Sequence, residues 1–264
     1  MEKAAIKKGY TTEVNFYPTF AFKNNAHPDS LFAFPLVGFI IKLVMLIPVG
    51  IFLMLIGIVY AFLWFLTPFV ILFTGKYWEV AYDFTVNYLT YKTKVFLFLS
   101  GLTDKYPGFS LDANGLFELT VPKPTKPNRW LALPIFGFII RVILLVPYDI
   151  YLAVLTYGMY TSIVASWFSV LIKGKYSESL YEFNHDAWRV SLASTVYTSY
   201  LSDTYPSFKI SMKHKNLKIA LIVIGAILFM LAGTRNVQNN QQRMKDMQQH
   251  PAQNQQMYKG PVGY

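Results

Sequence analysis

The feature of this chain that most constrains its fold is an internal repeat at one fixed offset. Ten residues of the first half recur in the second half, each 99 positions later (134 − 35 = 99; 208 − 109 = 99). They are Pro35, Gly38, Pro48, Gly75, Tyr77, Phe84, Asp104, Tyr106, Pro107 and Phe109, which recur as Pro134, Gly137, Pro147, Gly174, Tyr176, Phe183, Asp203, Tyr205, Pro206 and Phe208. An offset that needs no gap predicts two tandem copies of one structural module.

Each copy begins with a long apolar stretch, 31–73 in the first and 130–172 in the second. One membrane-spanning helix needs about 20 residues, so each stretch is long enough for two. A proline, Pro48 or Pro147, interrupts each stretch near its first third, and proline fits best at a helix start. We therefore predict an apolar hairpin in each copy, with a shorter helix before the proline and a longer one after it. The longer helix should end at the glycine of a repeated Gly-Lys-Tyr block, Gly75 or Gly174. The shorter helix would either span a thinned bilayer or lie in the interface.

The third element of each copy, 78–100 and 177–199, carries polar residues at helical spacing. In the first copy Glu79, Asp83 and Asn87 are four residues apart, which places them on one side of a helix. The second copy is more strongly charged over its equivalent residues, Glu178, Glu182, Asn184, His185, Asp186 and Arg189. So many charges are unsuited to a lipid-facing span. We expect an amphipathic helix that lies along the interface or packs on the spanning helices.

The remaining segments divide the chain around the two modules. Asn114-Gly115 lies between short apolar runs, which predicts a small β-hairpin in the linker, and the N-terminal arm alternates like a strand that could pair with it. The predicted division is an N-terminal cytoplasmic arm (1–30), module 1 (31–111), a linker (112–129), module 2 (130–210), a basic flank with a transmembrane anchor (211–233), and a polar tail rich in Gln and Asn (234–264).

The composition indicates a chain whose main solvent is lipid. Of its 264 residues, 54% are hydrophobic and 14% are charged, against about 25% charged in soluble domains. The predicted fold class is an all-α integral membrane protein with two tandem helical modules and a C-terminal transmembrane helix. The formal charge of +10 comes mostly from residues that flank apolar stretches, which favours contact with anionic lipid headgroups over binding of nucleic acid. The chain has no cysteine, which excludes disulfides and thiol catalysis.

The hairpin interpretation also predicts a topology. Most Lys and Arg fall on one side if each long stretch crosses twice, and that side should be the cytoplasm. The chain would then cross five times, with the N-terminus in the cytoplasm and the tail outside or in the periplasm. The alternative is an interfacial first helix and a spanning third one, which would place Lys76 and Lys175 outside.

Two groups of residues are candidates for a functional site. Lys42 and Arg141 are equivalent charges inside the apolar stretches, where an isolated charge costs roughly 2.5 to 3.5 kcal/mol. Each would snorkel to an interface or pair with an acidic residue of its own module, Asp83 or Glu182. The second group is the polar cluster Glu182, His185 and Asp186, which we expect to be a solvated or interfacial face. Its counterpart in the first copy is Val86-Asn87, so a chemistry shared by both modules cannot depend on that histidine.

The repeated blocks GFIIK/GFIIR, TGKYWE/KGKYSE and LTDKYPGF/LSDTYPSF, together with the proline break and the amphipathic helix, resemble a prokaryotic membrane family, the domain of unknown function 4389. The resemblance covers about 31–111 and 130–210. It implies a multi-pass protein of a bacterial or archaeal inner membrane, and it implies no activity and no catalytic residues.

The sequence favours a binding or structural function over catalysis. It has no phosphate-binding glycine loop, no Gly-x-Ser-x-Gly elbow and no His-Glu-x-x-His spacing, so we expect no enzyme activity, no cofactor and no metal. Our first hypothesis is a scaffold or accessory component that contacts lipids and associates with protein partners or with itself. The alternative is a small-solute transporter or channel subunit built from duplicated modules. A lipid-modifying enzyme comes third and rests only on the polar cluster.

Overall fold

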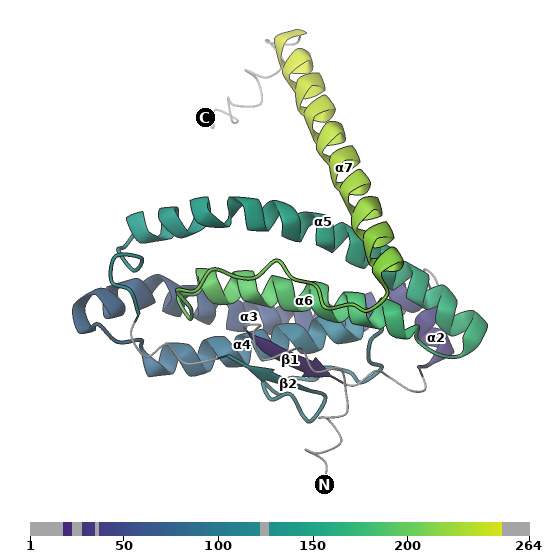
Figure 1. Cartoon of the computed structure of the whole chain (residues 1–264), viewed down its shortest axis with the longest axis horizontal. Coiled ribbons are helices and arrows are strands. Elements are labelled where there is room, and N and C mark those ends of the chain that lie inside the picture. Colours follow the sequence, from purple (N-terminus) through teal and green to yellow (C-terminus); the bar gives the residue numbers. More distant parts are fainter. Residues whose placement is uncertain (1–17, 23–27, 35–36, 122–126, 250–264) are drawn as a thin grey trace, which may run out of the picture.

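Two helical pairs, one from each copy of the repeat, form the body of the protein, and a last helix leaves this body at a steep angle (Figure 1). In the computed structural model the described residues are 18–22, 28–34, 37–121 and 127–249. The helices are α2 (Ser30–Ala33), α3 (Val37–Thr74), α4 (Glu79–Leu99), α5 (Phe136–Lys173), α6 (Glu178–Thr198) and α7 (Lys215–Gln249), and the strands are β1 (Thr19–Phe22) and β2 (Phe117–Thr120). Helices dominate the structure, so the predicted all-α class is confirmed.

The long apolar stretch of each copy forms one continuous helix, so the predicted break at its proline was wrong. α3 and α5 each have 38 residues, and Pro48 and Pro147 lie inside them. Proline removes one backbone donor, but an apolar helix in lipid tolerates it because the helix cannot expose its other backbone groups to form a turn there. At about 1.5 Å per residue each helix is about 57 Å long, nearly twice the hydrocarbon thickness of a bilayer.

Both long helices end where the sequence predicts, at the glycine of the repeated Gly-Lys-Tyr block. Gly75 and Gly174 have φ of 70° and 64°, and each donates its amide to a carbonyl of the last turn. A left-handed residue at this position is the usual way to stop a helix, and glycine adopts it without steric cost. The chain then reverses into α4 or α6, so each module is a pair of antiparallel helices.

The two modules pack on each other reciprocally, with α3 and α5 running in opposite directions (Figure 1). The ring of Phe39 lies 5.8 Å from that of Trp167, and the ring of Phe138 lies 5.1 Å from that of Trp64. Because Phe39 and Phe138 are equivalent positions, each contact joins the start of one long helix to the later half of the other. If both long helices cross a bilayer, the two copies are inverted relative to each other, whereas the predicted hairpins would have placed them the same way up.

α6 lies at the centre of the body, so of the two arrangements expected for it, along the interface or packed on the spanning helices, it has the second. Fifteen of its 21 residues are buried, and they include its charged residues from Glu182 to Arg189. The other module contacts it through Trp188, whose ring stacks on Phe96 at 3.8 Å and whose Nε1 donates to Thr93. α4 agrees better with the prediction, since Glu79, Asp83 and Asn87 are exposed.

The small sheet pairs the N-terminal arm with the linker, as the alternating arm sequence suggested. β1 pairs antiparallel with β2, with Phe20 opposite Leu119 and Phe22 opposite Phe117. Asn114 and Gly115 both have positive φ and form a turn, but the described partner of β2 is β1 and not the segment before that turn. The prediction of a hairpin within the linker was therefore wrong, and the prediction of a pairing with the arm is confirmed.

The last helix crosses α5 at two glycines. A Cβ on Gly158 would lie 2.8 Å from the carbonyl oxygen of Leu221, and a Cβ on Gly225 would lie against the Val154 carbonyl and 2.8 Å from the Gly158 amide. Backbone therefore meets backbone at this crossing, which small residues permit in membrane helices. The predicted anchor is confirmed as a helix, and this helix continues into the polar segment as far as Gln249.

A single methyl group at this crossing should separate the two helices. We expect Gly225→Ala to destabilise the fold by about 1–3 kcal/mol, because neither backbone can move away without losing the packing around it. Gly50→Ala is the matched control, since a Cβ there has no atom within 4 Å. Thermal unfolding in detergent should show a lower midpoint for the first variant only, and equal midpoints would contradict the close crossing.

Within the described residues, three helices are long and apolar enough to cross a membrane: Val37–Thr74, Phe136–Lys173 and Lys215–Asp246. The prediction of five crossings was wrong because each expected hairpin is one helix. The length and composition of these helices, together with their large exposed apolar surfaces, define an integral membrane protein.

Candidate functional site

The cation inside the second long helix holds three parts of its module together. The Arg141 guanidinium forms an ion pair with Asp203 and donates to the carbonyl oxygens of Tyr197 (2.8 Å), Ser202 (2.9 Å) and Leu131 (3.2 Å). These partners lie before α5, at the end of α6 and in the turn that follows. Arg141 is 1% exposed, so its charge is satisfied inside the protein and not by water or headgroups.

The carboxylate and the nearby rings complete this site. Asp203 also accepts a hydrogen bond from the Asn128 amide (2.7 Å), and Asn128 Oδ1 accepts one from the Trp130 amide (3.0 Å). The guanidinium carbon lies 4.8 Å from the ring centroids of both Tyr197 and Tyr200, at a distance typical of cation–π contacts. A delocalised cation with five donors suits such an arrangement of carbonyls, carboxylate and aromatic faces.

The first copy repeats this frame with a lysine. Asp104 accepts a hydrogen bond from the Asp29 amide (2.9 Å), as Asp203 does from the Asn128 amide. The Lys42 ammonium lies 5.5 Å from the ring centroid of Phe32 and 5.6 Å from that of Phe98, and it too is 1% exposed. We call these two sets of residues the cation sites of the modules.

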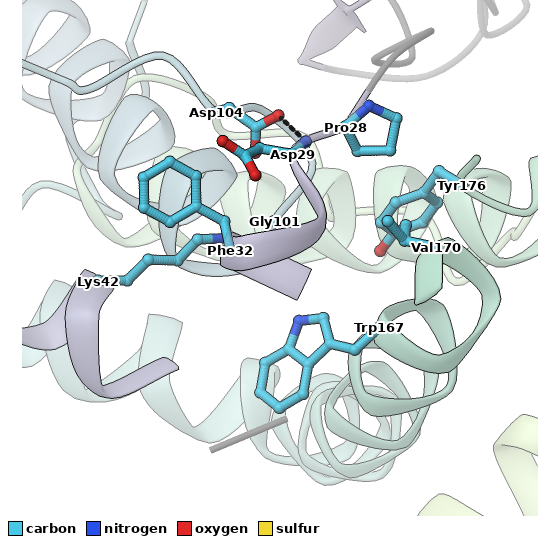
Figure 2. Close-up of a pocket in the computed structure, with 9 residues that line it drawn as sticks. All are labelled: Pro28, Asp29, Phe32, Lys42, Gly101, Asp104, Trp167, Val170 and Tyr176. Atoms are coloured by element: carbon cyan, nitrogen blue, oxygen red, sulfur yellow. Dashed lines mark hydrogen bonds between the residues drawn. The ribbon is translucent and has the colours of Figure 1, made fainter. Parts of the chain in front are cut away.

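A cavity of about 10 Å³ lies in the first cation site (Figure 2). Gly101 stands where the second copy has Tyr200, and lysine is smaller than arginine, so less volume is filled. Trp167 closes the cavity from the other module, and its buried indole Nε1 has no hydrogen-bond partner among the described residues. A cavity of this volume fits one water molecule between the indole N–H, the ammonium and the carboxylates.

The Tyr176 hydroxyl also borders the cavity and accepts a hydrogen bond from Asn184 (3.0 Å). Burial raises the pKa of this hydroxyl to about 12, outweighing hydrogen bonds with Ser166 and Asn184 that lower it. Tyr176 is therefore a neutral donor and acceptor at physiological pH.

The predicted charge pairs, Lys42 with Asp83 and Arg141 with Glu182, were wrong. The cations lie at the far end of the return helix from these acids: Lys42 contacts Phe98, which is 15 residues beyond Asp83 (98 − 83 = 15), or about 22 Å along α4. The same separation holds between Glu182 and Tyr197. The true partners, Asp104 and Asp203, were visible in the sequence as the repeated Asp-x-Tyr-Pro turn, but the predicted proline break hid how the chain brings them to the cations.

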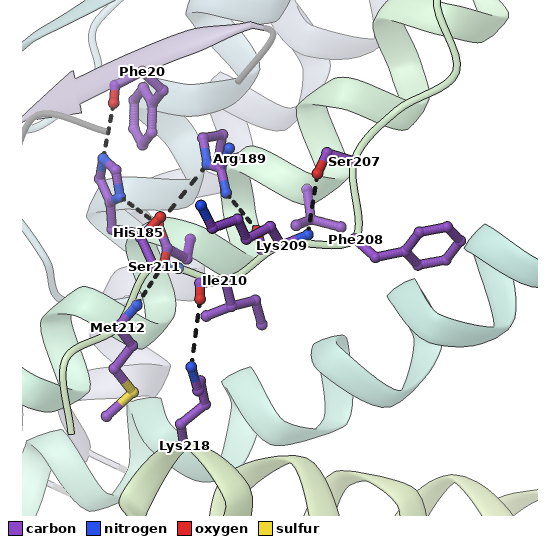
Figure 3. Close-up of polar contacts among 12 residues, drawn as sticks. Phe20, His185, Arg189, Ser207, Phe208, Lys209, Ile210, Ser211, Met212 and Lys218 are labelled. Carbon is purple, nitrogen blue, oxygen red and sulfur yellow. Dashed lines mark hydrogen bonds and ion pairs between the residues drawn. The ribbon is translucent and has the colours of Figure 1, made fainter. Parts of the chain in front are cut away.

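The segment 202–214, which we call the strap, follows α6, and the polar cluster of this helix binds the strap backbone between Lys209 and Lys213 (Figure 3). Asp186 Oδ2 accepts hydrogen bonds from the amides of Ser211 (2.5 Å) and Met212 (3.1 Å). Glu182 Oε2 accepts one from the Lys213 amide (3.1 Å). These carboxylates replace the hydrogen bonds that an extended backbone would otherwise make with water.

The two cationic members of the cluster are also engaged. Arg189 donates to the Lys209 carbonyl (2.9 Å), and its Nε lies 3.8 Å from Asp186. His185 has one ring nitrogen 2.9 Å from the Phe20 carbonyl of β1 and the other 3.3 Å from Asp186 (Figure 3). The cluster thus ties both the strap and β1 to α6.

The expectation that Glu182, His185 and Asp186 form a solvated or interfacial face was wrong, because their side chains are 2%, 0% and 0% exposed. Charged groups are retained in this interior because each has a polar partner there: Glu182 and Asp186 accept from strap amides, Arg189 donates to the Lys209 carbonyl, and His185 contacts the Phe20 carbonyl. In the described part of the chain, no three His, Asp or Glu side chains are arranged to hold a metal ion.

Exchanging the two cations should test the difference between the sites. Arg141→Lys should lower stability by about 1–3 kcal/mol, since an ammonium cannot reach three carbonyls and a carboxylate together. Lys42→Arg should leave stability unchanged or raise it, because the longer side chain enters the cavity and reaches equivalent carbonyls. Chemical unfolding of both variants measures this, and equal losses of stability would contradict the proposed difference between the sites.

These features define a membrane protein made of two interlocked copies of one helical module, each built around a buried cation. The chain matches the domain of unknown function family DUF4389 twice, over residues 37–110 and 137–209. The two matches cover more than half of the sequence, and the chain belongs to this family. Comparisons with curated proteins and with solved structures gave no match.

Proposed function

We propose that this protein is a non-enzymatic scaffold or accessory component of the membrane. The observation that supports this most strongly is the use of its buried charges. The Arg141 site and the α6 cluster, which carry most of the polar chemistry of the core, are occupied by contacts that join one chain segment to another. Groups committed in this way are poorly placed to bind and release a substrate.

The outer surface offers a large area for contact with lipid or with other membrane proteins. α3 exposes apolar side chains along its whole length, from Ile40 at 56% to Phe73 at 80%. α5 does the same from Phe136 at 70% to Ile172 at 79%. Such continuous apolar faces suit helices that pack in a bilayer against lipid or against another membrane helix.

Photo-crosslinking from these faces tests the scaffold proposal. A photoreactive residue at Ile51 or Phe62, both exposed on α3, should give discrete adducts with another membrane protein in native membranes. The same residue at Ile71, which is buried, is the matched control and should give crosslinks within the chain only. Adducts with lipid alone at both exposed positions would overturn the proposal.

One observation favours the second candidate, a small-solute transporter or channel subunit. The cavity beside Lys42 lies at the contact between the two copies, where transporters built from repeats place their substrate sites. Flux of ions or small solutes across vesicles that hold the purified protein would support it if Lys42→Met abolished the flux.

We further propose a prokaryotic inner membrane as the location, with the N-terminal arm in the cytoplasm and the end of α7 outside. The basic residues before the apolar part of α7 support this orientation, because Lys213, Lys215 and Lys218 precede it closely. Reporters fused after Tyr77 and after Tyr176 should report opposite sides if α3 and α5 both cross, since these helices are antiparallel. The same side for both would show that the long helices do not each cross once.

A further inference from the structure

An apolar stripe runs from the end of the apolar segment of α7 into the polar segment that follows it. Met230, Gly233, Val237, Asn240 and Met244 follow one another at spacings of three and four residues. Val237 and Met244 are 57% and 56% exposed, although their neighbours are almost all Gln, Asn or charged residues. We call these five residues the α7 seam.

The spacing is that of a helix that pairs with another helix. Alternating steps of three and four give a period of 3.5 residues, which keeps one face toward a partner over several turns. Gly233 has open space around its Cβ position, so a partner backbone could approach closely there. Asn240 is the one polar member, and its side-chain amide carries both donors and an acceptor, so the asparagines of two copies can hydrogen-bond to each other across the seam.

The charges of this segment leave the seam clear. Arg235, Lys245 and Asp246 occupy positions away from it, and Arg243 is the one charge on its flank. In a parallel pair of α7 helices, the residues that flank the seam on one helix face those that flank it on the other. Because Arg243 is the one charge among them, no two like charges would meet. The rest of the described chain stays clear of this end of α7 (Figure 1).

The membrane supplies the remaining condition for pairing. Two copies inserted in one bilayer have the same direction and the same depth, so Met230, Val237 and Met244 of each copy stand level with those of the other. A second copy is thus the occupant that always presents a matching face in the correct register. An unrelated partner would need the same pattern at the same height.

We infer that the protein forms a parallel homodimer through the α7 seam, with the helices in contact from the end of the apolar segment into the polar extension. This interface is separate from the outer faces of α3 and α5 and does not depend on the scaffold proposal.

Cysteine crosslinking in native membranes tests the dimer directly, because the wild-type chain has no cysteine. Val237→Cys and Met244→Cys should each give a disulfide-linked dimer under mild oxidation. Gln242→Cys is the matched control, since it is exposed at an intermediate height on the opposite face of the helix. We expect the crosslinked fraction at the seam to exceed that of the control by about tenfold.

A second variant separates specific pairing from random collision. Val237→Glu should repel its copy across the seam and reduce crosslinking through Met244→Cys about tenfold, whereas Gln242→Glu should leave it unchanged. Equal crosslinking at positions 237 and 242, or adducts of another mass in place of the dimer, would overturn the inference. The inference would also be overturned if Val237→Glu left crosslinking through Met244→Cys unchanged.

Discussion

Arg141→Ala should remove most of the folded protein from the membrane. The variant loses three hydrogen bonds to carbonyls and leaves the Asp203 carboxylate, which is 27% exposed, without its cation. Removing one partner of a buried ion pair costs about 3–5 kcal/mol, because the other charge remains without compensation. This is a large part of the stability of a typical protein. Fluorescence-detected size exclusion of detergent extracts should show a collapse of the monodisperse peak.

Lys175→Ala is the matched control, since this residue is exposed just after the same helix. It should elute like the wild type. If Arg141→Ala eluted like the wild type and unfolded at the same denaturant concentration, the guanidinium would not hold the three parts of its module together.

Asp186→Ala should release the strap from α6. The amides of Ser211 and Met212 lose their acceptor, and Arg189 loses the nearby carboxylate, inside a helix that is buried on nearly all sides. We expect a loss of about 3–5 kcal/mol, or local detachment of the strap if the rest of the body stays folded. Hydrogen exchange at residues 207–213 distinguishes these outcomes.

Asp83→Ala provides the comparison, because Asp83 is exposed on α4 at a position where the second copy has Glu182. Exchange of the strap amides should not change in that variant. Unchanged exchange in Asp186→Ala as well would show that the carboxylate does not hold the strap.

Two features of the fold were predicted well from the sequence: the repeated module and the residues at which the two long helices end. The constant offset identified the modules, and the glycines of the Gly-Lys-Tyr blocks marked the ends of α3 and α5. The alternation of the N-terminal arm predicted a strand that pairs with the linker, as β1 does with β2. These signals are local or periodic, so they do not depend on tertiary contacts.

The break predicted at Pro48 and Pro147 was wrong because proline favours helix starts mainly where water can hydrogen-bond the backbone groups that a broken turn exposes. In lipid the cost of ending a helix is larger than that of one missing hydrogen bond. This error also affected the site, because a continuous α3 carries Lys42 far from Asp83 and close to the turn after α4.

The exposure predicted for the polar cluster of α6 was wrong for a different reason. Its charges resemble an interfacial face, and the sequence does not show that an extended strap returns along the helix and uses each charge. Glu182 and Asp186 bind backbone amides, which have no side-chain signature, so a pattern of residue types could not reveal them as acceptors. The repeated Asp104 and Asp203 were the available signal for the cation sites.

A double-mutant cycle on Arg141 and Asp203 tests the central claim, that the buried charges of this protein join its chain segments, most directly. The free energy of unfolding would be measured for the wild type, Arg141→Ala, Asp203→Ala and the double variant. We predict strong coupling, with the double variant less destabilised than the sum of the single variants by about 1–3 kcal/mol. Losses that simply add would contradict the claim.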